Sequence, residues 1–260
     1  MKSVSVSLAG AVLALFMLAG CSPAARTKSA PELPDFEGFW DNLSGFHIDD
    51  FTSAAKGDEL GSREFRPADP PYNAEYAAQW KVVQESHAQG RPINDPTATC
   101  LWPGVPRVIW NPFPVEIVIS DQGRRITFLE EYMSQVRRVY ADGRGHPEDV
   151  EPSYNGHTIG HWEGQTLVMD TVGLREDTML QNTGMMHSDA LQVKERWRLV
   201  EPDVLEAEIT MIDPKAFTAP YVTRRLYRRH RDWTIQDYVC EENNRERIVD
   251  GVTTNFPPKK

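Results

Sequence analysis

The feature that most restricts the fold is a series of short β-rich segments after Pro96, with no helical pattern between them. Gly, Pro, Asp and Asn separate the segments, which is typical of antiparallel strands joined by turns. The segments are PRVIWNPFPVEIVIS, RRITFLEEYM, QVRRVYAD, HTIGHW, TLVMDTV, LQVKERWRLV, VLEAEITMID, YVTRRLYRRH and DWTIQDYV. They predict a mostly β protein whose antiparallel meander forms a barrel or a strongly curved sheet. Pro112 and Pro114 interrupt the first segment, so its opening part should lie at an edge or outside the sheet.

One helix is expected ahead of the strands, over residues 74–88. Asn73 is a suitable N-cap, Tyr76 and Trp80 follow at helical spacing, and Gly90 comes directly after the pattern ends.

Residues 1–20 have the pattern of a bacterial lipoprotein signal peptide, with Lys2 before an apolar run that is too short to span a bilayer. The sequence LAGC ends at Cys21, the position at which such proteins are lipidated and cleaved. Lipidation of Cys21 would anchor the mature chain to a membrane. Ser22 stands where an inner-membrane retention signal has Asp, so the periplasmic face of the outer membrane is the expected location. An ordinary secretory signal with a chance cysteine is the alternative.

The remainder of the chain divides into a tether, residues 21–33, and a single β-rich domain, residues 34–260. The formal net charge of the whole chain is −10 at pH 7, which disfavours nucleic acid as a partner. No GxGxxG motif leads from a strand into a helix, so no dinucleotide cofactor is expected, and a small molecule is the expected partner.

Cys100 and Cys240 are the cysteines outside the signal region, and they lack CxxC spacing. In an oxidising compartment this favours one disulfide between them. Two free thiols, or one catalytic thiol, are the alternative, although Cys100 has no base nearby in the sequence and neither cysteine has the surroundings of an activated thiol.

Alternation along the strands places ionisable groups on apolar faces. Glu195 shares its face with apolar residues in LQVKERWRLV, as His157 does in HTIGHW and Asp170 in TLVMDTV. In RRITFLEEYM, alternation leaves open whether Glu130 or Glu131 faces inward. These groups are therefore expected inside the barrel, where an unpaired charge costs several kcal/mol.

Two interpretations of the inward groups remain open. Arginines such as Arg137, Arg138 and Arg224 would neutralise them in a purely structural network. Alternatively, they are acids and bases with displaced pKa values in a ligand cavity.

The leading functional hypothesis is an enzyme that uses acid/base catalysis for elimination, dehydration or isomerisation of a small, partly apolar molecule. The candidate groups are His157 as base, Glu195 or Asp170 as its orienting partner, His187 or Tyr154 as acid, and Arg137 as oxyanion partner.

Three alternatives accompany it. A binding lipoprotein would hold a hydrophobic ligand unchanged, with Trp102, Trp110, Trp162 and Trp197 as candidate walls. A metal-dependent hydrolase would use His157 and His187, with His161 and Asp170 or Glu195 as further ligands, although HxxxH on a strand lacks the geometry it has on a helix. A triad of Ser188, His187 and an Asp can be composed, but no GxSxG elbow is present.

The chain from about Tyr72 onward resembles a large group of uncharacterised bacterial exported proteins. The motifs that carry the resemblance are PPYNAEYAAQW, NDPTATCLWPGVPR, FPVEIV, EEYMSQVRRVYADGRGHPED, PSYNGHTIGHWEGQTLVMDTVG, HSDALQVKERWR and CEENNR. The resemblance implies a lipocalin-like β fold and gives no activity. It favours Glu131 as the inward acid and has His at the positions of His157 and His187. Relatives carry Arg at the position of His161, which argues against a metal role for that residue.

Overall fold

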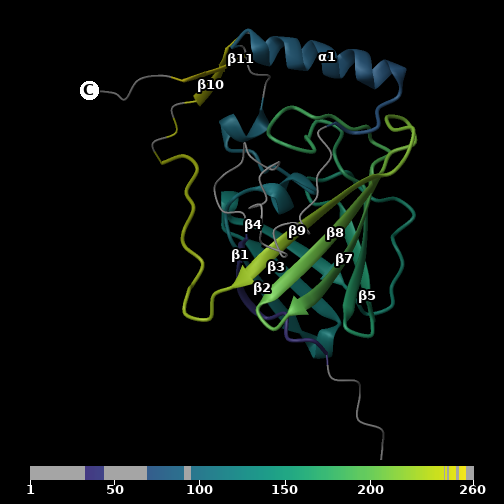
Figure 1. Ribbon diagram of the computed structural model, residues 1–260, viewed down its shortest axis with the longest axis vertical. Helices are drawn as coiled ribbons and strands as arrows, with labels where there is room; N and C mark the ends of the chain where they lie inside the picture. The colour runs from purple at the N-terminus through teal and green to yellow at the C-terminus, as the bar shows by residue number, and fades with distance from the viewer. Residues whose placement is uncertain are drawn as a thin grey trace, which may run out of the picture. The chain divides into compact units, whose positions relative to one another are not determined.

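Nine strands close on themselves into a barrel in the computed structural model (Figure 1). The strands are β1 (Gly38–Asn42), β2 (Val115–Ser120), β3 (Arg125–Glu130), β4 (Gln135–Tyr140), β5 (His157–Glu163), β6 (Thr166–Val172), β7 (Gln192–Glu201), β8 (Val204–Ile212) and β9 (Tyr221–Arg229). The prediction of a mostly β barrel with one helix is confirmed for the residues that the structure describes.

The structure describes residues 33–43, 69–90, 95–242, 244, 246–249 and 252–255. They belong to a compact unit that spans Leu33–Lys260. The expected signal peptide, the lipidation site Cys21 and nearly all of the expected tether lie outside the described residues.

Each barrel strand pairs with its neighbour in the chain, and β1 closes the ring by pairing with both β2 and β9. All these pairs are antiparallel except β4 with β5, which run in parallel and are matched at Val139 with Thr158 and at Tyr140 with Ile159. The connection between these two strands, residues 141–156, is correspondingly long, because the chain must return to the end of the barrel at which β4 began.

The strand predictions differ from the structure at both ends of the chain. The strands at residues 246–249 and 252–255 were not expected. Strand β1, with the sequence GFWDN, was not expected either, because five residues that include Gly, Asp and Asn give a weak strand signal. The segment DWTIQDYV is not a strand; its backbone is instead held by side chains of the β3–β4 turn. The N–H of Gln236 donates to the Glu131 carboxylate at 3.0 Å, and the Ser134 hydroxyl donates to the carbonyl of Tyr238 at 3.0 Å.

Aromatic side chains from β3, β7 and β9 meet inside the barrel. The rings of Phe128 and Trp197 lie 5.0 Å apart, and those of Trp197 and Tyr227 lie 5.4 Å apart and nearly parallel. Trp40 from β1 is also fully buried. This part of the interior is therefore packed core.

The segment before β2 closes one end of the barrel. It contains the short 3₁₀ helix η3 (Arg107–Trp110), whose four residues are all buried. The Tyr227 hydroxyl donates to the carbonyl of Ile109 at 2.9 Å, and the Asn42 amide donates to the carbonyl of Asn111 at 3.2 Å. The prediction that the part before Pro112 and Pro114 lies outside the sheet is confirmed.

The helix α1 (Ala74–Ala88) has the predicted bounds, and the Asn73 side chain accepts the N–H of Tyr76 as its N-cap. Trp80 is its buried residue, and the Asn73 amide also donates to the carbonyl of Lys215. Within the described part of the chain, no helix is both long and apolar enough to cross a membrane.

The remaining elements are short. They are the 3₁₀ helices η2 (Pro96–Thr99), η4 (Asp121–Gly123) and η5 (Tyr132–Ser134), and a two-stranded sheet of β10 (Glu246–Val249) and β11 (Val252–Asn255). Cys100, which ends η2, forms a disulfide with Cys240, with the two Cα atoms 5.6 Å apart. The predicted pairing is thereby supported.

Candidate functional site

An ion pair lies inside the barrel, where alternation on β7 placed Glu195. The Arg137 guanidinium donates two hydrogen bonds to the Glu195 carboxylate, at 3.0 and 2.5 Å, and both side chains are almost completely buried. The Trp197 indole donates to the same carboxylate at 2.9 Å, and Arg137 also contacts the hydroxyls of Thr158 and Thr171. Because the carboxylate and guanidinium already bind each other, this arrangement matches the structural interpretation more closely than that of an oxyanion partner.

The inward acid of β3 is Glu130, whereas Glu131 lies in the following turn. Glu130 has 6% of its surface exposed, and it is matched with Val115 and Gln135 in the sheet. Burial raises the pKa of Glu130 to about 8; the charge of Arg137 opposes this rise and that of Glu195 adds to it. The expectation that Glu131 faces inward is wrong, because the pairing register of β3 places the side chain of Glu130 on the inner face.

His157 and Asp170 lie on the outer face of the barrel, so the prediction that they point inward is wrong. Thr158 and Thr171 take the inner positions of β5 and β6 and are buried against Arg137. Both faces of β6 carry apolar residues, so its alternation did not identify the core side.

A third residue, His146, joins these two outer groups. Its Nδ1 lies 2.9 Å from Nδ1 of His157, and its Nε2 lies 4.0 Å from the Asp170 carboxylate. Burial lowers the pKa of His157, and the nearby His146 and Arg144 lower it further. His146 lies in the 141–156 connection, where no periodic pattern marks it, and sequence reasoning missed it.

His187 is buried in the loop between β6 and β7, away from this outer cluster. Its Nδ1 lies 2.8 Å from the carbonyl of Ser188, and its Nε2 lies 2.9 Å from the Thr178 hydroxyl. Burial lowers the pKa of His187, although the hydrogen bond to Ser188 and the charge of Asp213 oppose this. The Ser188 hydroxyl donates to Asp213 at 2.6 Å, so it does not form the composed triad with His187.

The other predicted groups are also dispersed. Tyr154 packs edge-on against Trp102, with the Arg175 guanidinium 4.9 Å from its ring centre. His161 is exposed beside Glu163, at 3.1 Å. Among the described residues, no three His, Cys, Asp or Glu side chains gather as ligands for a metal ion.

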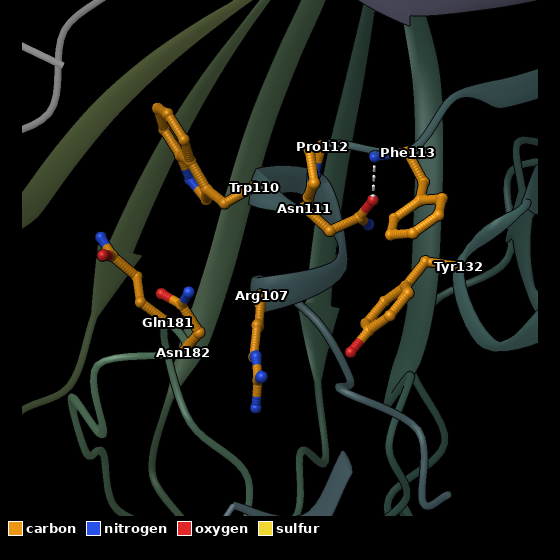
Figure 2. A pocket seen from close by; sticks show the side chains of 8 residues that line it. All are labelled: Arg107, Trp110, Asn111, Pro112, Phe113, Tyr132, Gln181 and Asn182. Atoms are coloured by element: carbon orange, nitrogen blue, oxygen red, sulfur yellow. Dashed lines mark hydrogen bonds between the residues drawn. The ribbon is translucent and has the colours of Figure 1, made fainter. Parts of the chain in front are cut away.

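A pocket of about 180 Å³ lies at the end of the barrel that η3 closes. We call it the mouth pocket. Its lining residues are Arg107, Trp110, Asn111, Pro112, Phe113, Tyr132, Gln181 and Asn182. They come from the η3 segment, from η5 and from the β6–β7 loop, so three separate parts of the chain build it (Figure 2).

The mouth pocket combines aromatic and amide groups. The rings of Phe113 and Tyr132 stack 5.1 Å apart, and Figure 2 shows them on one side of Arg107, with Gln181 and Asn182 on the other. Both terminal nitrogens of the Arg107 guanidinium donate hydrogen bonds to the Asp95 carboxylate, each at 2.7 Å. The charge of Arg107 is therefore balanced before any ligand binds.

Of the tryptophans expected as ligand walls, Trp110 lines the mouth pocket, and the guanidinium of Arg225 lies 5.1 Å from its ring centre. The other lining residues were not predicted, because the pocket is formed by turns and loops whose meeting no local pattern encodes. Searches of protein-family models, curated proteins and solved structures found no match to the chain.

Proposed function

We propose that the protein is a lipoprotein of the cell envelope that binds a small, single-ring molecule at the mouth of its barrel. The observation that carries this proposal is the mouth pocket, with its stacked Phe113 and Tyr132 beside amide side chains. An apolar cavity of roughly 150 Å³ is enough to hold benzene. The pocket, at about 180 Å³, therefore suits one substituted ring.

The polar lining favours a neutral ligand. The charge of Arg107 is balanced by Asp95, so a free carboxylate would gain less there than at an unpaired arginine. Amide groups such as that of Asn182 can donate and accept hydrogen bonds. A ring with a hydroxyl or carbonyl substituent would stack on Tyr132 and Phe113 and satisfy these groups.

The place of action is proposed from the N-terminal sequence. LAGC at Cys21, after a signal-like run, supports lipidation and anchoring at the periplasmic face of the outer membrane. The Cys100–Cys240 disulfide agrees with an oxidising compartment.

Binding of phenol and of related single-ring compounds, measured by protein NMR, tests the proposal. Asn182→Trp should fill the mouth pocket and abolish saturable binding, and Tyr132→Ala should weaken binding about tenfold through the lost aromatic contact. Tyr76→Ala, on α1 outside the pocket, is the matched control and should bind normally. If Asn182→Trp binds phenol as well as the parent protein does, the ligand does not sit in the mouth pocket.

Acid/base catalysis remains a second candidate because of the chain Asp170, His146, His157 on the outer wall. In the tautomer in which His146 carries its proton on Nε2, on the side of the Asp170 carboxylate, the Nδ1 lone pair of His146 accepts a hydrogen bond from Nδ1–H of His157. Nε2 of His157 is then left as a base, with its pKa lowered by burial. In this case, the His157→Gln variant should still bind the ligand but no longer convert it. If the parent protein itself leaves the bound ligand chemically unchanged, the catalytic proposal is wrong.

A further inference from the structure

A second hollow, more open than the mouth pocket, lies beside it. It has a volume of about 490 Å³, and we call it the acidic groove. Its lining residues are Phe39, Asp41, Pro112, Phe113, Pro114, Glu131, Asp232, Trp233, Thr234 and Gln236. Pro112 and Phe113 line both hollows, so these two residues form a wall that the hollows share. The groove is nevertheless built mainly from β1 and from the segment after β9.

Aromatic rings form one component of the groove. Trp233 packs edge-on against Phe39 at 5.7 Å and stacks on His230 at 3.8 Å. It still exposes 49% of its surface. A tryptophan held in place by two neighbours and yet half exposed is an unusual use of the largest apolar side chain, and it offers a ring surface to a ligand.

Carboxylates form the other component. Asp41, Glu131 and Asp232 line the groove, and its lining includes no Lys or Arg. Burial raises the pKa of Asp41, although the N–H of Asn42, His230 and Arg225 oppose this rise. Arg228 is matched with Asp41 across β1 and β9, but no ion pair joins the two side chains. The groove therefore has negative charge that the described residues around it do not neutralise by direct pairing.

We propose that the acidic groove binds an organic cation of the quaternary ammonium class. Such a cation is attracted to the negative face of an aromatic ring, and its apolar surface packs against tryptophan and phenylalanine. Carboxylates beside the rings add attraction without requiring a hydrogen-bond donor on the ligand. An anion would meet three carboxylates, and a neutral apolar ligand would bring no positive charge to them.

Choline and 3,3-dimethylbutan-1-ol test the proposal because they have nearly the same shape and only choline is charged. Calorimetric titration of the purified protein should give saturable binding of choline and at least about tenfold weaker binding of the neutral alcohol. Added salt should weaken choline binding. Equal affinities for the two compounds, or no binding of choline, would overturn the proposal.

Variants locate the site. Trp233→Ala and Asp41→Asn should each lower the affinity for choline about tenfold. Asp232→Asn, an exposed position, should also weaken binding and keeps the test valid if the tryptophan variant fails to fold. Glu148→Gln, an exposed acid in the 141–156 connection, is the matched control and should leave the affinity unchanged.

The acidic groove and the mouth pocket are separable in the same experiment. Asn182→Trp, which fills the mouth pocket, should leave choline binding intact. Loss of choline binding in this variant would instead place the cation in the mouth pocket and reject the acidic groove as its site.

Discussion

At the scale of single residues, the carboxyl of Glu130 should make the stability of the barrel depend on pH. Its pKa is about 8 in the folded protein and has an ordinary value of 4.5, so the folded state holds the proton more tightly. The stabilising contribution is fully present below pH 4.5 and is lost as the pH rises through about 8. Glu130→Gln cannot ionise, and should be more stable than the parent protein at pH 8, by roughly 5 kcal/mol at most.

Urea unfolding of both proteins between pH 5 and pH 8.5 measures this difference. The advantage of Glu130→Gln should grow with pH. If the difference in the free energy of unfolding between the two proteins is the same at every pH, folding does not raise the pKa of Glu130.

The buried pair of Arg137 and Glu195 supports a second residue-scale prediction. Arg137→Met leaves the carboxylate of Glu195 buried without its cation, and should lower the free energy of unfolding by about 3–5 kcal/mol. The double variant, with Glu195→Met added, should recover part of this loss, because neither member of the pair is then left as a buried charge without its partner. Arg175→Met breaks the exposed pair with Asp177 and should cost no more than about 1 kcal/mol.

Denaturant unfolding of these variants provides the comparison. If the double variant has a lower free energy of unfolding than Arg137→Met alone, the prediction is wrong. The Glu195 carboxylate would then stabilise the fold even without Arg137.

Sequence reasoning reached some residues of this interior and missed others for a physical reason. Glu195 was placed correctly because β7 has one clearly apolar face. Glu130 was not distinguished from Glu131, because both alternations of that segment carry apolar residues and only the pairing register decides between them. His146 depends on a long connection returning to β5, which no local pattern encodes.

At the scale of elements, two glycines of the β5–β6 region form a matched pair. Gly156 and Gly164 both have φ of +60°, but a Cβ on Gly156 would lie 2.4 Å from the carbonyl oxygen of Val172, whereas one on Gly164 would meet nothing within 4 Å. Gly164→Ala should cost only the backbone penalty of about 1–2 kcal/mol. Gly156→Ala should cost at least about 2 kcal/mol more, because β5 and β6 must separate at that point.

Thermal unfolding of the two variants tests this difference. Equal melting temperatures would mean that the chain before β5 shifts freely, and that the approach of Gly156 to Val172 does not constrain the hairpin.

Most elements could be predicted from local signals. The helix was predicted to the residue because Asn73 caps it and Gly90 follows it, and the segments of β2 to β9 were all anticipated. The segment DWTIQDYV shows the limit of such signals. It has strand-like residues, yet Trp233 and Tyr238 are held by side-chain packing against Phe39 and Phe113, and the segment pairs with no strand among the described residues.

At the scale of the whole molecule, the Cys100–Cys240 disulfide joins positions 140 residues apart in the sequence. Closing so long a loop restricts the unfolded chain, and its removal should lower the free energy of unfolding by roughly 5 kcal/mol. The double variant Cys100→Ser with Cys240→Ser should show this loss without a reductant. Reductant should destabilise the parent protein and have no effect on the double variant.

A parent protein whose melting temperature is unchanged by reductant would contradict this prediction. The two cysteines could be predicted as a pair from their number and compartment, but their place beside η2 and the segment after β9 depends on the closed barrel.

The parallel pairing of β4 with β5 follows from arithmetic. In a ring whose neighbours always run in opposite directions, the number of members must be even, and this ring has nine. One pair must therefore break the rule, and the chain places it where only Val139 with Thr158 and Tyr140 with Ile159 are matched. The contact between β4 and β5 is therefore the shortest in the barrel. Backbone amides between these two strands should exchange their hydrogens faster than those between β7 and β8. If so, the barrel opens first along the line between β4 and β5, and the pair of His146 and His157 lies beside that line.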